Sequence, residues 1–217
     1  MTTSSRAAAR TREPARVAAL PAPPELPAGL ARRPRVLELI SADSVSLGCG
    51  SDRDVRQCLD VARATARALD PHARIRCSAS AVTAIYHLDL LTASENNQWS
   101  VSRRPGTARQ VLVEEMRDLA DARLIATGPG RKRQRGSGHA DLVVLVGRDP
   151  LYADPVRRLR LLGIPTWLLV PGRQVDPWLS AHACAVSFLG PDDPDLTTSG
   201  QLAPASARCP AVQGDRA

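Results

Sequence analysis

The sequence predicts an α/β protein in which helices cover both faces of a parallel sheet, forming a three-layer α/β/α sandwich. In the middle of the chain, segments with the pattern of strands alternate with segments whose apolar residues recur at helical spacing. Residues 141–146 (DLVVLV) are a continuous apolar run, which is typical of a strand covered on both faces. With 217 residues, of which 43% are hydrophobic, the chain is long and apolar enough for one packed domain.

Composition divides the chain into three parts. Residues 1–34 are rich in alanine, proline and arginine without a sustained period, which predicts a disordered arm. Residues 190–217 are rich in proline, aspartate, serine and glycine, which predicts a disordered tail. The α/β domain is therefore expected to span residues 35–189.

The first half of this domain is expected to contain three strands and three helices. Ser51 and Asp54 form a capping-box pattern at the start of the first helix, whose apolar residues then recur at helical spacing. The predicted strands are 35–42, 74–80 and 98–103. The predicted helices are 51–70, 81–91 and 107–121.

The second half continues the alternation. Asp154 and Asp176 are each followed by a proline and are predicted as helix N-caps, because an aspartate can accept from the free amides and proline fits the first helical position. The two helices are expected to end at Gly163 and near Cys184. The predicted strands are 124–126, 141–146, 165–170 and 185–189, with a loop at 127–139.

The net charge of +7 rests almost entirely on arginine, since Lys132 is the single lysine among 29 basic residues. A mildly basic domain is compatible with a phosphate-rich partner such as RNA, and equally with a solvated arginine-rich surface. The longest apolar stretches fall far short of the ~20 residues needed to cross a bilayer. We therefore expect no membrane partner.

The cysteines and the N-terminal sequence predict a cytoplasmic protein. The five cysteines are odd in number and widely spaced, without the C-x-x-C pairs or histidine spacing of a zinc site. No apolar segment follows the polar residues after Met1, so a secretory signal is not expected. Free thiols in a reducing cytoplasm are the simplest interpretation.

Two aspartates are the candidate site residues. Asp43 follows the first predicted strand, and Asp149 follows strand 141–146. In an open α/β sheet, ligands bind beyond the carboxyl ends of the strands, where the loops diverge. Two carboxylates at that edge could hold Mg²⁺, with water and a substrate phosphate completing its coordination. The alternative is that each aspartate only occupies a loop or caps a helix.

Two segments resemble an NYN domain, a member of the PIN-like superfamily of metal-dependent ribonucleases. Residues 141–189, with DLVVLVGRDPLYADPVRRLRLLGIPTWLLV and WLSAHACAVSFL, resemble its carboxyl half. The strand LELISAD, which ends at Asp43, resembles its opening strand and first metal-binding aspartate. The resemblance covers about residues 35–189. It implies a sandwich of PIN-like type that cleaves RNA, with Asp43 and Asp149 as catalytic residues and as ligands of Mg²⁺ or Mn²⁺.

The chain departs from the family at the other polar positions. These positions fall on Ser46, on Leu151, on Cys184 and, at the start of the middle helix, on Arg109 or Gln110. Glu114 and Glu115, one turn further along that helix, are possible substitutes for the missing acid. Two carboxylates hold one Mg²⁺ weakly, and a two-metal site is less expected. The resemblance therefore implies either a slow nuclease or a nuclease fold kept for RNA binding.

A glycine-flanked basic run is the sharpest charge feature. Arg131, Lys132, Arg133 and Arg135, together with Arg148 beside Asp149, are candidate RNA contacts, because a flexible basic loop can clamp phosphates. The alternative is a solvated, disordered insertion.

Three classes of function remain open. The first is a metal-dependent endoribonuclease acting on single-stranded or structured RNA, and the second is a non-catalytic RNA-binding or regulatory module on the same fold. A nucleotide-sensing or receiver-like domain is the third, and it is weaker because no phosphoacceptor-and-lysine arrangement is evident.

Overall fold

A computed structural model provides the structure of the protein and describes residue 21 and residues 33–87, 98–102, 107–127 and 139–189. The strands are β1 Val36–Ser41, β2 Arg74–Ser80, β3 Gln98–Ser102, β4 Leu142–Val146, β5 Thr166–Pro171 and β6 Ala185–Leu189. The helices are α1 Ala42–Gly48, α2 Asp52–Leu69, α3 Ala81–Tyr86, α5 Thr107–Thr127, α6 Ala153–Leu161 and α7 Pro177–His182, with a 3-10 turn η1 at Pro150–Tyr152. Most of the predicted arm and all of the predicted tail lie outside the described residues.

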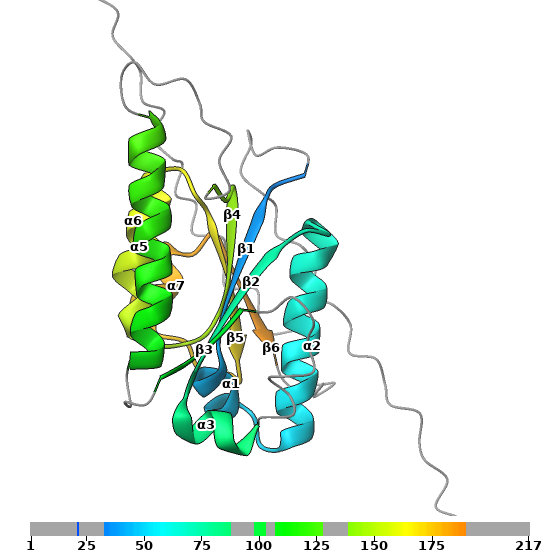
Figure 1. The fold of residues 1–217 in the computed structure, drawn as a ribbon. Helices are drawn as coiled ribbons and strands as arrows, with labels where there is room; N and C mark the ends of the chain where they lie inside the picture. Colours follow the sequence, from blue (N-terminus) through cyan, green and yellow to red (C-terminus); the bar gives the residue numbers. More distant parts are fainter. Residues whose placement is uncertain (1–20, 22–32, 88–97, 103–106, 128–138, 190–217) are drawn as a thin grey trace, which may run out of the picture.

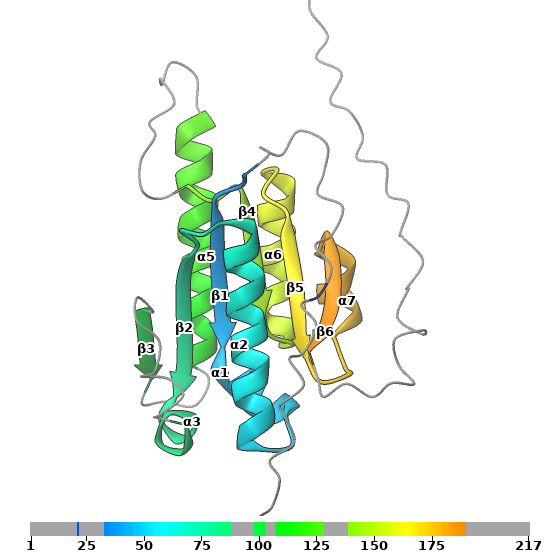
Figure 2. The ribbon, with the colours of Figure 1, turned by 90° about the vertical axis from the view of Figure 1, so that its right-hand side faces the viewer.

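The six strands form one sheet in the order β3-β2-β1-β4-β5-β6, and every neighbouring pair is parallel. Helix α2 covers one face, and α5, α6 and α7 cover the other, so the predicted three-layer α/β/α sandwich is confirmed (Figure 1). Figure 2 shows the strands side by side, pointing toward the end of the sheet where α1 and α3 lie. That end is the carboxyl edge of the sheet.

Alternating side chains of β1 enter two separate apolar cores. Leu37 and Leu39 pack in the core that contains Met116 of α5. Ile40 packs in the other core, which contains Leu59 of α2. Because both faces of the sheet are covered, β1, β4 and β5 are buried along their whole length, as the apolar run in 141–146 predicted.

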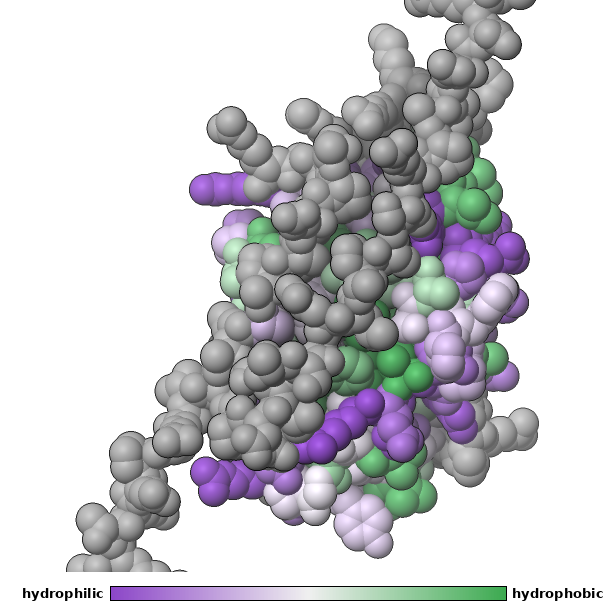
Figure 3. All heavy atoms as spheres, turned by 180° about the vertical axis from the view of Figure 1, so that it is seen from behind, coloured by the Kyte–Doolittle hydropathy of each residue, from purple (hydrophilic) through white to green (hydrophobic). Residues whose placement is uncertain are grey.

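The surface carries scattered apolar side chains. On the side opposite to Figure 1, the coloured residues are a mixture of hydrophilic and hydrophobic ones (Figure 3). Leu161, Trp178 and Phe188 are among the exposed large apolar residues, a pattern that is normal when such residues occur singly. In the described residues, no helix is long and apolar enough to cross a membrane, and the four cysteines there are free thiols.

Several predicted boundaries are confirmed. Strands β2 and β6 have the predicted bounds. Asp176 caps α7 as predicted, since its Oδ1 accepts a hydrogen bond from the amide of Leu179 at 2.9 Å. Helix α2 begins after Ser51, whose hydroxyl accepts from the amide of Asp54 at 3.3 Å, as the capping-box pattern indicated.

Other local predictions are wrong. The predicted strand 124–126 lies inside α5, which continues to Thr127. Asp154 is not an N-cap, because the helical backbone begins earlier, at Pro150, and Asp149 caps that turn. The sequence also does not predict α1, which begins directly after β1 because Ser41 accepts a hydrogen bond from the amide of Ser44 at 3.4 Å. Asp43 therefore lies in the first turn of a helix rather than in a loop.

Helix α1 ends against the end of β5, and Gly48 makes this approach possible. A Cβ at Gly48 would lie 2.6 Å from the carbonyl oxygen of Pro171, which is backbone and has little room to move.

We expect Gly48→Ala to lower the free energy of unfolding by about 2 kcal/mol, because overpacking displaces the backbone. Urea denaturation measures this change. Gly50→Ala is the matched control, since its Cβ would meet only the Asp54 carboxylate at 3.7 Å, and an equal loss in both variants would contradict the expectation.

Candidate functional site

A hollow at the carboxyl edge lies where the chain changes direction across the sheet. Strand β1 continues to α2 on one face, whereas its neighbour β4 continues to α6 on the other face. The loops after such neighbouring strands diverge and leave a crevice, the usual ligand site of open α/β sheets. Here the crevice is a pocket of about 570 Å³, and both Asp43 and Asp149 line it. The structure thus brings the two predicted residues to one pocket.

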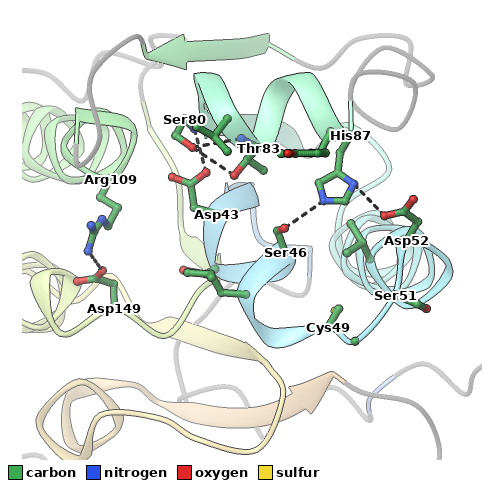
Figure 4. A pocket seen from close by; sticks show the side chains of 16 residues that line it. Asp43, Ser46, Cys49, Ser51, Asp52, Ser80, Thr83, His87, Arg109 and Asp149 are labelled. Atoms are coloured by element: carbon green, nitrogen blue, oxygen red, sulfur yellow. Dashed lines mark hydrogen bonds and ion pairs between the residues drawn. The ribbon is translucent and has the colours of Figure 1, made fainter.

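The end of β2 fixes the orientation of Asp43. The Oδ1 atom of Asp43 accepts a hydrogen bond from the amide of Ser80 at 2.9 Å. Ser80 is the last residue of β2 and also caps α3, because its hydroxyl accepts from the amide of Thr83 at 3.3 Å. The carboxylate of Asp43 therefore links α1 to the junction between β2 and α3 (Figure 4).

Both carboxylate oxygens of Asp149 already have partners. Oδ1 accepts from the amide of Leu151 at 3.0 Å, which caps η1. Oδ2 forms a short, charge-assisted hydrogen bond with Nη1 of Arg109, from the first turns of α5 (Figure 4). The hydrogen bond to Asp149 raises the pKa of the Arg109 guanidinium above its ordinary value. Asp149 is only 16% exposed, whereas Arg109 is 44% exposed, and both residues line the pocket.

These residues do not fit a tight magnesium or manganese site. In the part of the chain that the structure describes, no group of three or more metal-ligating side chains gathers. The guanidinium of Arg109 instead occupies Oδ2 of Asp149, an oxygen that a cation would need. Glu114 and Glu115, which the sequence offered as possible metal ligands, do not reach the site: Glu115 pairs with Arg76 at 3.3 Å, and neither glutamate lines the pocket.

The structure does not bring the predicted RNA contacts into the pocket. Arg148 donates from Nη2 to the carbonyl oxygen of Leu47 at 3.2 Å and does not line the pocket. Arg131, Lys132, Arg133 and Arg135 lie outside the described residues. Leu151 and Cys184, where the resemblance would place two further acids, do not line the pocket either.

The pocket also contains a cluster that sequence analysis missed. Ser46 of α1 and Nε2 of His87 lie 3.0 Å apart, and Nδ1 of His87 lies 3.5 Å from Oδ1 of Asp52. These residues are spread over 41 positions of the chain and match no spacing motif, so only the fold brings them together. The one available signal was the resemblance, which aligns Ser46 with a polar position.

Comparisons with known proteins add little to this geometry. No protein-family model matches the chain, and no curated protein sequence matches it. Among solved structures, the chain is similar to a protein of unknown function from Vibrio parahaemolyticus, with a TM-score of 0.42 and 13% identity, covering 75% of this chain and 96% of that chain. A likeness of this extent supports no statement about function.

Proposed function

We propose that this protein is an RNA-binding module on an NYN-type fold, in which Arg109 supplies the positive charge that a metal ion supplies in the nucleases. The observation that carries the proposal is the ion pair between Arg109 and Asp149 inside the pocket at the carboxyl edge. A guanidinium has five donors in a planar fork, so it can contact a carboxylate and still bind a phosphate oxygen. The resemblance of residues 35–189 to the NYN domain and the net charge of +7 support RNA as the ligand.

A fixed cation in this position favours binding over cleavage. Metal-dependent nucleases use their ion to activate water and to offset the charge that develops on the phosphodiester. Arg109 can neutralise phosphate charge, but a guanidinium does not lower the pKa of a bound water to generate hydroxide. The arrangement therefore accounts for phosphate recognition without a hydrolytic step at Asp43 and Asp149.

A metal-dependent endoribonuclease is the second candidate, and one observation favours it. The pocket lining includes three carboxylates, those of Asp43, Asp52 and Asp149, against the single guanidinium of Arg109. An excess of negative charge attracts divalent cations, and a phosphate of the substrate could complete their coordination. In this candidate Asp43 and Asp149 remain the metal ligands and catalytic residues.

Fluorescence anisotropy with a labelled single-stranded RNA separates the two candidates. We expect binding that weakens with added salt, is the same in EDTA and in Mg²⁺ or Mn²⁺, and leaves the RNA intact. We expect Arg109→Gln to weaken binding by about tenfold, the effect of losing one charged phosphate contact. Arg158→Gln is the matched control, because Arg158 pairs with Asp121 away from the pocket.

Two results would contradict the RNA-binding module. Metal-dependent cleavage that is lost in Asp43→Ala would establish the ribonuclease instead. Equally strong RNA binding by Arg109→Gln, Arg158→Gln and the wild type would show that RNA does not bind in this pocket.

A further inference from the structure

Three elements contribute one side chain each to a polar cluster in the pocket. Ser46 lies in α1, His87 is the C-cap of α3, and Asp52 is the first residue of α2. The Oγ atom of Ser46 is 3.0 Å from Nε2 of His87, and Nδ1 of His87 is 3.5 Å from Oδ1 of Asp52. Figure 4 shows the imidazole between the hydroxyl and the carboxylate, on the opposite side of the pocket from the Arg109–Asp149 pair.

The burial of His87 restricts what its two nitrogens can do. The imidazole is buried, with 8% of its surface exposed, and its backbone amide is held by the carbonyl oxygen of Thr83 at 3.0 Å. Among the described residues, Nδ1 is buried without a hydrogen-bond partner, and the carboxylate of Asp52 lies 3.5 Å from it, close enough to become the acceptor after a small shift of the exposed aspartate. With the Nδ1 proton directed toward Asp52, Nε2 is left as the acceptor for the hydroxyl proton of Ser46.

We propose that Ser46, His87 and Asp52 form a nucleophilic serine site that hydrolyses small carboxylic esters. Ser46 Oγ attacks the ester carbonyl carbon while its proton passes to Nε2 of His87. The bond from that carbon to the alcohol oxygen then breaks, and the alcohol leaves with the proton from Nε2. Water next attacks the acyl-serine, giving its proton to Nε2, and the carboxylic acid leaves as Ser46 recovers its hydroxyl proton. Asp52 acts through His87 as a positioning residue.

The pocket lining indicates the substrate class. A volume of about 570 Å³ suits a small molecule. Val55, Val82 and Tyr86 line the pocket and offer apolar contacts for a short acyl chain. The chain from Gly50 to Asp52 also lines it, and the first amides of α2 have no intrahelical acceptor. In the proposed reaction, this turn would supply the N–H donors that an oxyanion intermediate requires.

Labelling with a fluorophosphonate probe tests the site directly, because phosphonylation needs an activated serine. We expect the intact protein to gain one adduct that peptide mass spectrometry places on Ser46, and p-nitrophenyl butyrate to be hydrolysed. Ser46→Ala should abolish both, and His87→Gln should slow labelling by at least ~100-fold, the usual contribution of a general base. Ser180→Ala is the control, since the Ser180 hydroxyl contacts the carbonyl oxygen of Pro177 outside the pocket.

The role of Asp52 is tested by kinetics rather than by loss of activity alone. Asp52 is 84% exposed, so its effect on the imidazole is screened by water. We expect Asp52→Asn to lower kcat for the butyrate ester by about tenfold without raising KM, and Asp52→Glu to recover most of it. A purely structural role would instead change the unfolding midpoint and affect both variants alike.

The outcomes are independent of the RNA proposal. An adduct absent from Ser46, or labelling at the wild-type rate in His87→Gln, would overturn the serine site. If His87→Gln does not fold, Ser46→Cys is the variant to test. Ester hydrolysis at the wild-type rate, with no acyl group on the new cysteine, would also overturn the serine site. The labelling and ester assays contain no RNA, and the anisotropy assay contains no ester, so that failure of one proposal is distinguishable from failure of the other.

Discussion

Glu38→Gln is expected to stabilise the protein at alkaline pH and to remove much of the pH dependence of its stability. Glu38 lies in the middle of β1, is fully buried on the α2 side of the sheet, and neither of its carboxylate oxygens has a hydrogen-bond partner in the described residues. Burial raises the pKa of Glu38 from 4.5 to about 8, although the charges of Arg63 and Arg67 lower it in part. The folded protein therefore holds this carboxyl in its neutral form near pH 7.

The sign of the effect follows from the two pKa values. Between pH 4.5 and about 8, the unfolded chain loses the proton of Glu38 while the folded chain keeps it. The contribution of Glu38 to the free energy of unfolding is therefore fully present below pH 4.5 and is lost as the pH rises to about 8. Glutamine stays neutral in both states, so its advantage over glutamate should grow from near zero at pH 4.5 to the order of 4 kcal/mol above pH 8.

Urea denaturation of both proteins at several pH values measures this difference. Glu114→Gln is the matched control, because Glu114 is exposed on α5 and its replacement should change stability by less than about 0.5 kcal/mol at each pH. A Glu38→Gln protein that is strongly destabilised at pH 7 would contradict the expectation. It would show instead that Glu38 is ionised in the folded protein and paired with the buried Arg63. The substitution would then leave the Arg63 charge buried without its partner, which lowers the free energy of unfolding.

The sequence predicted the sheet well because its signals were local. The apolar run before Asp149 identified β4, and the cap formed by Asp176 located α7. Helix α1 was not predictable in the same way, since seven residues are too few for a helical period to show. The strand expected at 124–126 failed for a related reason: a few apolar residues cannot distinguish a strand from the last turn of a longer helix.

The candidate site was predictable only in part. Asp43 and Asp149 could be placed together because the carboxyl ends of parallel strands share one edge, and the pocket lies there. The partner of Asp149 could not be foreseen, because Arg109 is 40 residues away and reaches it only through the packing of α5 on the sheet. The contact between Ser46 and His87 depends in the same way on how α1 and α3 meet at the edge.

Arg109→Glu is expected to create divalent-cation binding, and this result would follow from the proposed role of Arg109 as a substitute for the metal. The substitution removes the guanidinium from Oδ2 of Asp149 and adds a carboxylate to the pocket in its place. Asp43, Asp149 and the new glutamate would then supply the cluster of acids that the described residues lack. Clustered carboxylates repel one another until a cation neutralises them, which is the balance that favours tight binding.

Isothermal titration with Mn²⁺ and Mg²⁺ measures the gain. We expect no binding heat at millimolar metal for the wild type. We expect Arg109→Glu to bind at least ~100-fold more tightly, because a negative side chain replaces a positive one next to the half-buried Asp149. Arg158→Glu is the control: it makes the same change of net charge at the Arg158–Asp121 pair, outside the pocket, and should bind no metal. The double variant Arg109→Glu/Asp149→Asn should lose the gain, because one carboxylate of the new cluster is removed.

The same titration has outcomes that would reject the proposed role. Tight metal binding by the wild type would mean that a cation displaces Arg109 from Asp149, and the ribonuclease would then be the better interpretation. Absence of binding in a folded Arg109→Glu protein would mean that Asp43 lies too far from Asp149 to share an ion. In that case the Arg109–Asp149 pair would be a structural link between α5 and the N-cap of η1.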